Sequence, residues 1–99
     1  MTQIVFSRQA ELDLEEIGDF IAADNPDRAV TFVREIRDHC VRIAKSPLAY
    51  AARPEISEGI RACPHGRYVI FFRPAEAYVL VVRVLAGARH LPEAFGAEA

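Results

Sequence analysis

The sequence predicts an α+β fold in which a helical hairpin packs on one face of a small twisted antiparallel sheet. Three observations predict it: two amphipathic helical patterns in the first half, a short β-rich run before them, and three strand patterns in the second half. The predicted order is therefore β-α-α-β-β-β. A chain of 99 residues has room for one core, so we expect a single domain over residues 1–99.

The first strand and the first helix meet at a serine. Ile4-Val5-Phe6 is a short β-rich run, and Ser7 is a good N-cap for a helix that begins at Arg8. Apolar residues then recur at helical spacing, with Leu12 and Phe20 at the margin of the apolar face: Ala10, Leu14, Ile17 and Ile21. The acidic residues are predicted to form a solvated face: Glu11, Asp13, Glu15, Glu16 and Asp19.

A second helix follows after a very short turn. Asn25 suits its N-cap and Pro26 its first helical position, and the pattern continues to about Lys45 before Pro47. Its apolar face consists of five residues: Ala29, Val33, Ile36, Cys40 and Ile43. His39 is predicted to lie on the polar face. The short turn implies that the two helices pack as an antiparallel hairpin.

The second half predicts a surface connection over residues 46–58 and strands near residues 60–63, 68–73 and 78–85. The last two strands do not alternate apolar and polar residues, although alternate side chains point to opposite faces of a sheet. Two helices cover only one face. We therefore expect the second face to be an apolar patch that a partner covers, either a second copy or another chain.

Charge is distributed unevenly along the chain. The formal net charge is −2, which argues against a general nucleic-acid coat protein. Residues 1–50 carry six basic and nine acidic side chains, whereas residues 59–92 carry five arginines against the single acid Glu76, a net charge of +4. The second half therefore predicts a local cationic surface.

The two cysteines, Cys40 and Cys63, have neither the spacing of a metal site nor that of a disulfide framework, so we expect buried, reduced thiols. We expect no cofactor and no metal. The sequence shows no signal-peptide pattern and no apolar stretch long enough to cross a bilayer, which predicts a cytoplasmic protein without a membrane partner.

Three blocks of the sequence resemble the ParE branch of the RelE/ParE toxins of bacterial toxin–antitoxin pairs. They are "AELDLEEIGDFIAADNPDRAVTFV", "GIRACPHGRYVIFFR" and "RVLAGARHLP". The resemblance implies a ParD-like antitoxin whose C-terminal segment wraps the toxin and covers the sheet or the groove beside it. The candidate antitoxin contacts are Tyr68, Ile70, Phe72, Tyr78, Leu80 and Val82.

The resemblance also implies a toxin that binds and inhibits DNA gyrase, serves plasmid or chromosomal stabilisation, and needs neither catalytic residues nor sequence-specific nucleic-acid binding. The candidate target contacts are Arg61, Arg67, Arg83, Arg89 and His90. The chain departs from the family pattern at Ala86, where a histidine is usual, and at His90, where an aspartate is usual.

Two other functions stay open. A RelE-like ribosome-dependent mRNA endonuclease would use His90 with Arg67, Arg83 and Arg89, and Glu55 or Glu58 as a distant base. A non-toxic homodimeric module would bury the open sheet faces of two copies against each other.

Structural roles also compete with these functions. Arg83 could pair with Glu15 or Glu16 on the first helix. Arg61 and Arg67 could be solvated charges beside a turn, and His65 a residue of that turn.

Overall fold

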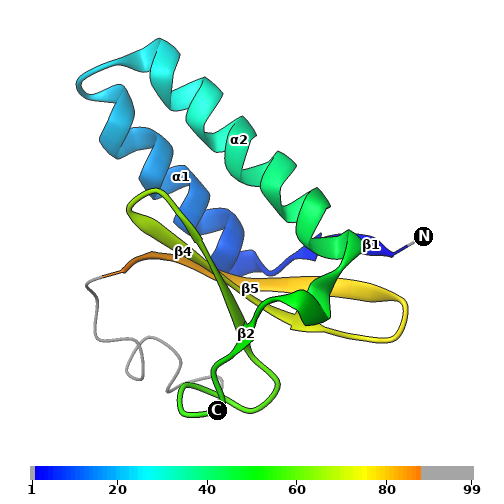
Figure 1. Cartoon of the computed structure of the whole chain (residues 1–99). Coiled ribbons are helices and arrows are strands. Elements are labelled where there is room, and N and C mark those ends of the chain that lie inside the picture. The colour runs from blue at the N-terminus through cyan, green and yellow to red at the C-terminus, as the bar shows by residue number, and fades with distance from the viewer. Residues whose placement is uncertain (1, 88–99) are drawn as a thin grey trace.

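A computed structural model describes residues 2–87. Two helices pack on one face of a five-stranded sheet of order β1-β5-β4-β3-β2, which confirms the α+β class (Figure 1). The elements are β1 Gln3–Phe6, α1 Arg8–Ala22, α2 Pro26–Lys45, the 3₁₀ turn Pro47–Ala49, β2 Ala51–Ala52, β3 Arg61–His65, β4 Tyr68–Pro74 and β5 Tyr78–Ala86. The two-residue β2 was not predicted and pairs with the start of β3.

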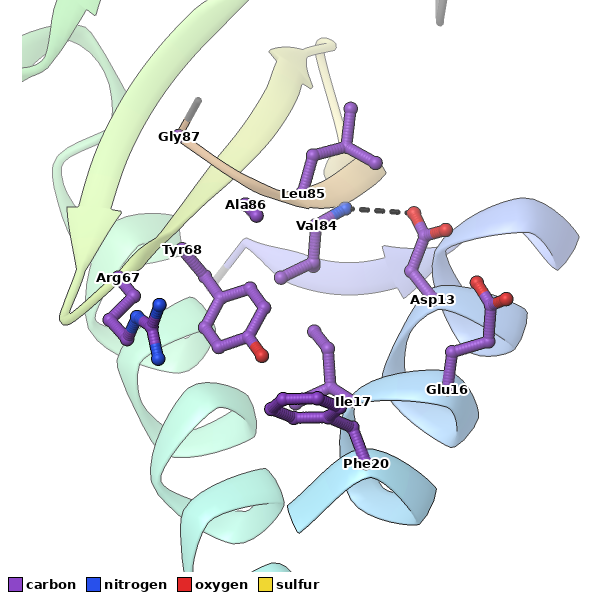
Figure 2. A pocket seen from close by; sticks show the side chains of 10 residues that line it. All are labelled: Asp13, Glu16, Ile17, Phe20, Arg67, Tyr68, Val84, Leu85, Ala86 and Gly87. Atoms are coloured by element: carbon purple, nitrogen blue, oxygen red, sulfur yellow. Dashed lines mark hydrogen bonds between the residues drawn. The ribbon is translucent and has the colours of Figure 1, made fainter. Parts of the chain in front are cut away.

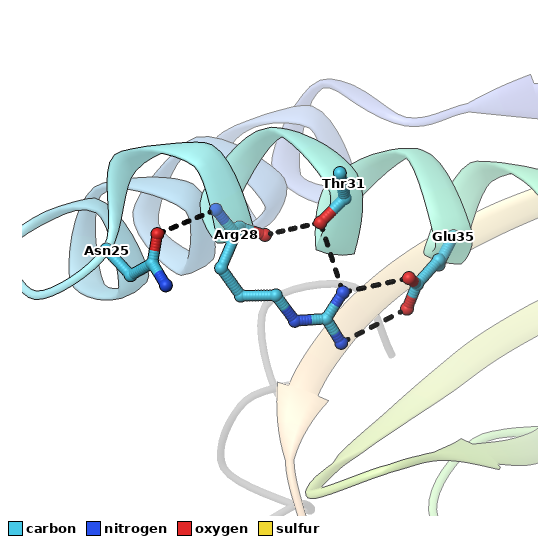
Figure 3. Close-up of polar contacts among 4 residues, drawn as sticks. All are labelled: Asn25, Arg28, Thr31 and Glu35. Atoms are coloured by element: carbon cyan, nitrogen blue, oxygen red, sulfur yellow. Dashed lines mark hydrogen bonds and ion pairs between the residues drawn. The ribbon is translucent and has the colours of Figure 1, made fainter.

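Both helices begin at the predicted caps. Ser7 Oγ accepts a hydrogen bond from the Ala10 amide at 2.9 Å, and Asn25 Oδ1 accepts one from the Arg28 amide at 3.1 Å. Figure 3 shows the cap of α2 and, further along the same face, an ion pair of 2.8 Å between Arg28 and Glu35. α2 runs from Pro26 to Lys45, which confirms its predicted bounds.

The sheet is mixed rather than antiparallel. β1 runs parallel to β5, with Gln3 opposite Tyr78 and Phe6 opposite Val81, whereas the other strand pairs are antiparallel. β5 leaves one edge free because β4 occupies the other, and β1 pairs with that free edge. Strand direction depends on this long-range pairing, so the local pattern of the first strand could not reveal it.

Both faces of β4 and β5 carry apolar side chains because both faces are covered, and a β-bulge shifts which residues of β5 point to each face. Phe71 faces Arg83 while Phe72 faces Val81, so Val82 has no partner across the pair. The side chains that pack under the helices therefore shift from the odd residues Val79 and Val81 to the even residue Val84. Other strand residues form a second cluster that does not belong to the helix-covered core: Val69, Phe71, Leu80, Val82 and Leu85.

The chain itself covers much of the second sheet face, which corrects the expectation of an open apolar patch. The loop of residues 53–60 packs Ile56 and Ile60 into the second cluster. Arg73 holds this loop in place, because its guanidinium donates to Ser57 Oγ at 3.0 Å and to the Glu58 carbonyl at 3.2 Å. Within residues 2–87 no helix lies on this face, as expected, but Phe71 and Val82 are nonetheless buried.

Beyond the end of β1, a buried carboxylate on α1 accepts a backbone hydrogen bond from β5 in place of a strand partner. Asp13 is only 3% exposed, which contradicts its predicted place on a solvated face. Its Oδ2 accepts hydrogen bonds from the Val84 amide at 3.0 Å and from Arg83 Nε at 2.8 Å, and its Oδ1 accepts one from Arg83 Nη2 at 3.0 Å. Arg83 thus pairs with a helix acid, but with Asp13 instead of Glu15 or Glu16.

Cys40 and Cys63 are both buried free thiols in the core under the helices. Burial raises the pKa of the Cys40 thiol to about 12 and also raises the pKa of the Cys63 thiol.

Neither α1 nor α2, the two α-helices of the described chain, has the length and apolar character needed to cross a membrane.

Thiol alkylation tests this burial. A pKa near 12 leaves Cys40 roughly a thousandfold less thiolate than an ordinary cysteine at the same pH. We expect iodoacetamide at pH 8 to leave Cys40 unmodified in the folded chain and to modify it quickly in urea, as followed by mass spectrometry. Equal rates in the two states would show that the thiol is accessible.

The Asp13→Asn variant tests the buried ion pair. The substitution leaves the Arg83 guanidinium without its carboxylate in a buried site, so we expect a loss of about 3 kcal/mol in the free energy of unfolding, measured by urea titration. Glu11→Gln is the matched control, since it breaks an exposed pair with Arg37 and should cost less than about 1 kcal/mol.

A double variant separates the charge from the backbone contact. Asp13→Asn combined with Arg83→Met also removes the guanidinium charge that Asp13 neutralised and leaves an amide oxygen for the Val84 amide, so it should recover most of the lost stability. A double variant as unstable as Asp13→Asn would contradict this account of Asp13.

Candidate functional site

A hollow of about 510 Å³ opens between α1, the β3–β4 turn and the end of β5 (Figure 2). α1 supplies one wall, the turn and the start of β4 supply the opposite wall, and β5 supplies the floor between them. The lining residues are Asp13, Glu16, Ile17, Phe20, Arg67, Tyr68, Val84, Leu85, Ala86 and Gly87. All of these residues lie within the three blocks that resemble the toxin family.

The walls of the hollow are largely apolar. Ile17 and Phe20 stand one above the other on α1, and the ring of Tyr68 reaches toward them from β4 (Figure 2). Phe20 is 68% exposed, although it is a large aromatic side chain next to a concave surface. An exposed aromatic side chain beside a pocket is typical of a residue that becomes buried when a partner binds.

The charged side chains of the hollow differ in whether they already form an ion pair within the described chain. Asp13 lies on the α1 side, near Glu16, and is already neutralised by Arg83 (Figure 2). Glu16 on α1 and Arg67 in the turn are exposed, and within residues 2–87 neither side chain forms an ion pair. The hollow thus offers one anionic and one cationic group on opposite walls.

The predicted cationic residues that the structure describes, Arg61, Arg67 and Arg83, do not gather in one cluster. Arg61 donates to the Tyr50 carbonyl at 2.7 Å and so holds the segment that leads into β2. Arg83 is committed to Asp13, whereas Arg67 projects from the turn as an exposed charge in the hollow. Arg89 and His90 lie outside the described residues.

The predicted apolar contacts separate onto two faces and differ in exposure. Ile70 and Phe72 are completely buried under the helices, so a partner cannot reach them in this structure. Val82 and Leu80 belong to the cluster on the second face, and Tyr78 is exposed at the start of β5. A further member of the predicted set, Tyr68, lines the hollow.

Those residues of the nuclease alternative that lie within residues 2–87 are also dispersed. Glu55 and Glu58 belong to the loop that covers the second face, whereas Arg67 lies at the hollow. The hydrogen bond from Arg53 holds the pKa of the Glu55 carboxyl below its usual range, which weakens it as a base. In the described part of the chain, no group of histidine, cysteine and acidic residues has the arrangement of a metal site.

The side chains of His39, Cys63 and His65 are linked by close polar contacts next to the β3–β4 turn, which lines the hollow. His39 Nδ1 is 2.8 Å from His65 Nδ1, and its Nε2 is 3.2 Å from Cys63 Sγ. His65 was predicted to be a turn residue and is instead the last residue of β3, in contact with α2. No local pattern indicated this cluster, because its members lie on a helix and a strand that only folding brings together.

Asp13, Glu16 and Phe20 are further site residues, which were predicted to lie on the solvated face or at the margin of α1. One signal was available: Asp13 lies one helical turn before Ile17 and one turn after Ala10, so it borders the apolar face. Its partner, in contrast, is 70 residues away in the sequence and could not be identified locally.

Comparison with known proteins agrees with this geometry. The family model described as "ParE toxin of type II toxin-antitoxin system, parDE" matches residues 4–91. A solved structure described as "Chromosomal ParDE TA system from P. aeruginosa" shares the fold, with a TM-score of 0.76, 21% sequence identity, and coverage of 87% of this chain and 96% of the other. Comparison with curated proteins finds no significant match. Because the family model spans most of the chain, the protein belongs to the ParE toxin family of type II toxin–antitoxin systems.

Proposed function

We propose that this type II toxin is neutralised by a ParD-like antitoxin, a segment of which occupies the hollow between α1 and the β3–β4 turn. The observation that carries the proposal is the exposed Phe20 beside the concave wall of Ile17 and Tyr68. The similar structure from P. aeruginosa is that of a chromosomal ParDE system, which supports a partner of the same kind for this chain.

The chemistry of the hollow specifies the segment that would fit. An apolar side chain of the antitoxin would pack between Phe20 and Tyr68 and remove both from water. A carboxylate on one side of it would pair with Arg67, and a basic side chain on the other would pair with Glu16. An amphipathic C-terminal segment meets all three requirements.

We further propose that the toxin acts by binding DNA gyrase and inhibiting it, without catalysis of its own. Membership of the ParE family supports this target. Of the predicted contacts, Arg67 retains an exposed side chain, Arg83 has a structural role with Asp13, and Arg89 and His90 stay predictions. An antitoxin seated in the hollow would cover Arg67, so neutralisation would follow from competition for one surface.

Truncation of Phe20 tests the antitoxin site. Phe20→Ala removes the largest exposed apolar group of the hollow, so we expect the affinity for the antitoxin encoded beside this toxin to fall roughly tenfold or more, measured by calorimetry. Leu48→Ala is the matched control, because Leu48 is 70% exposed but lies away from the hollow. Equal losses in the two variants would refute the assignment of the hollow.

A supercoiling assay tests the target. Titration of gyrase with the purified chain should abolish DNA supercoiling and accumulate cleaved DNA. Arg67→Ala should raise the toxin concentration needed by about tenfold, because a charged contact is lost. Arg34→Ala is the control, since Arg34 is an exposed arginine on α2 that does not line the hollow.

The folded wild-type chain must be active in this assay for the gyrase proposal to hold. If it leaves supercoiling intact, and instead cleaves mRNA on ribosomes, the endonuclease alternative replaces the gyrase proposal.

A further inference from the structure

The contact between His39 and His65 links α2 directly to the β3–β4 hairpin. His39 lies in the second half of α2, and His65 is the last residue of β3. Their Nδ1 atoms are 2.8 Å apart, and the other nitrogen of His39 lies 3.2 Å from Cys63 Sγ. Both His39 nitrogens therefore have a partner on β3.

This geometry limits how many protons the pair can hold. A hydrogen bond between two Nδ1 atoms needs one N–H group and one lone pair. Two neutral rings satisfy this requirement, and so does one charged ring beside a neutral one. When both rings are charged, each Nδ1 carries a hydrogen, so the bond is lost and two positive charges face each other at 2.8 Å.

The groups around the pair also affect whether it can take up a second positive charge. Burial lowers the pKa of His39, and the charges of His65 and Arg42 lower it further. Glu35 faces His65 from α2, but its carboxylate is already held by Arg28. Within residues 2–87, further titratable groups near the pair are Cys63, which contacts His39, its neighbour Cys40 in the core, and Tyr68, which lies opposite His65.

The pair also positions one wall of the hollow. Gly66 and Arg67 follow His65 directly, and Gly66 has φ of +59°, so the turn is tight. Phe32 on α2 packs against both His65 and Tyr68, with ring centroids 5.4 and 5.8 Å away. The segment that carries Arg67 and Tyr68 into the hollow is thus fastened to α2 at His65.

We propose that the His39–His65 contact is a proton-operated latch that holds the β3–β4 turn against α2 and releases it in acid. Release would displace Arg67 and Tyr68 from the wall of the hollow and weaken binding there. The regulatory consequence rests on the proposed function, whereas the latch itself is a property of the isolated chain.

The direction of the pH effect follows from His39. The pKa of His39 in the folded chain lies below its ordinary value of 6.5, so the unfolded chain binds more protons between the two values. The contribution of the latch is therefore complete above pH 6.5 and is lost as the pH falls through the lowered pKa of folded His39.

Hydrogen exchange of the isolated chain tests the latch. The Gly87 amide donates to the Arg67 carbonyl at 3.0 Å, so its protection factor reports whether the turn is in place. We expect this protection factor, corrected for intrinsic exchange, to fall at least about fivefold between pH 7.5 and 5.0 in the wild type.

Each histidine variant removes one titrating ring, so two positive charges can no longer face each other, but it keeps a polar side chain at that position. His65→Asn places a non-titrating amide near the position of Nδ1, so the fall should shrink to less than about twofold, and His39→Gln should have the same effect if His65→Asn does not fold. Asp38→Asn is the control: it removes an exposed charge next to His39 in sequence and should retain the full wild-type fall.

A wild-type protection factor that does not change with pH overturns the proposal, and so does a full fall in both histidine variants. These measurements use the chain without antitoxin or gyrase, so their outcome does not depend on whether either partner has been identified correctly.

Discussion

The fold depends on how the long edge of β5 is completed after β1 ends. β1 covers only four residues of a nine-residue strand, and beyond Phe6 the edge would expose its backbone groups beside α1. Ser7 donates to the Val82 carbonyl, and Asp13 accepts from the Val84 amide, so two side chains at the start of α1 replace a strand partner. Arg83 then neutralises the carboxylate that this arrangement buries.

The same edge determines where the side chains of β5 point. The bulge at Val82 lies opposite the step from Phe71 to Phe72 and switches the strand's face toward the helices from one residue parity to the other. Apolar side chains occupy both faces of the strand, one under α1 and α2 and the other under the loop of residues 53–60. A chain of 99 residues builds a two-sided core in this way without a third helix in its described part.

The candidate site lies where these constraints meet. Its floor is the end of β5, one wall is α1 with the Asp13 carboxylate, and its opposite wall is the turn that follows His65, which contacts His39 on α2. What remains for a partner is a concave apolar surface with Phe20 at its rim and two unlike charges across it. Such a surface suits recognition of an extended or helical protein segment.

The sequence by itself determined the local features of this protein: the helix caps Ser7 and Asn25, the positions of every described strand except β2, and the resemblance of three blocks to one toxin family. Caps, periodicity and turns act over a few residues, so they can be identified without the fold. Only the tertiary structure decided the parallel pairing of β1, the faces of β5 beyond the bulge, and the partner of Arg83. Each depends on contacts between residues far apart in the chain, and Asp13 and Arg83 are 70 positions apart, beyond the reach of any local pattern.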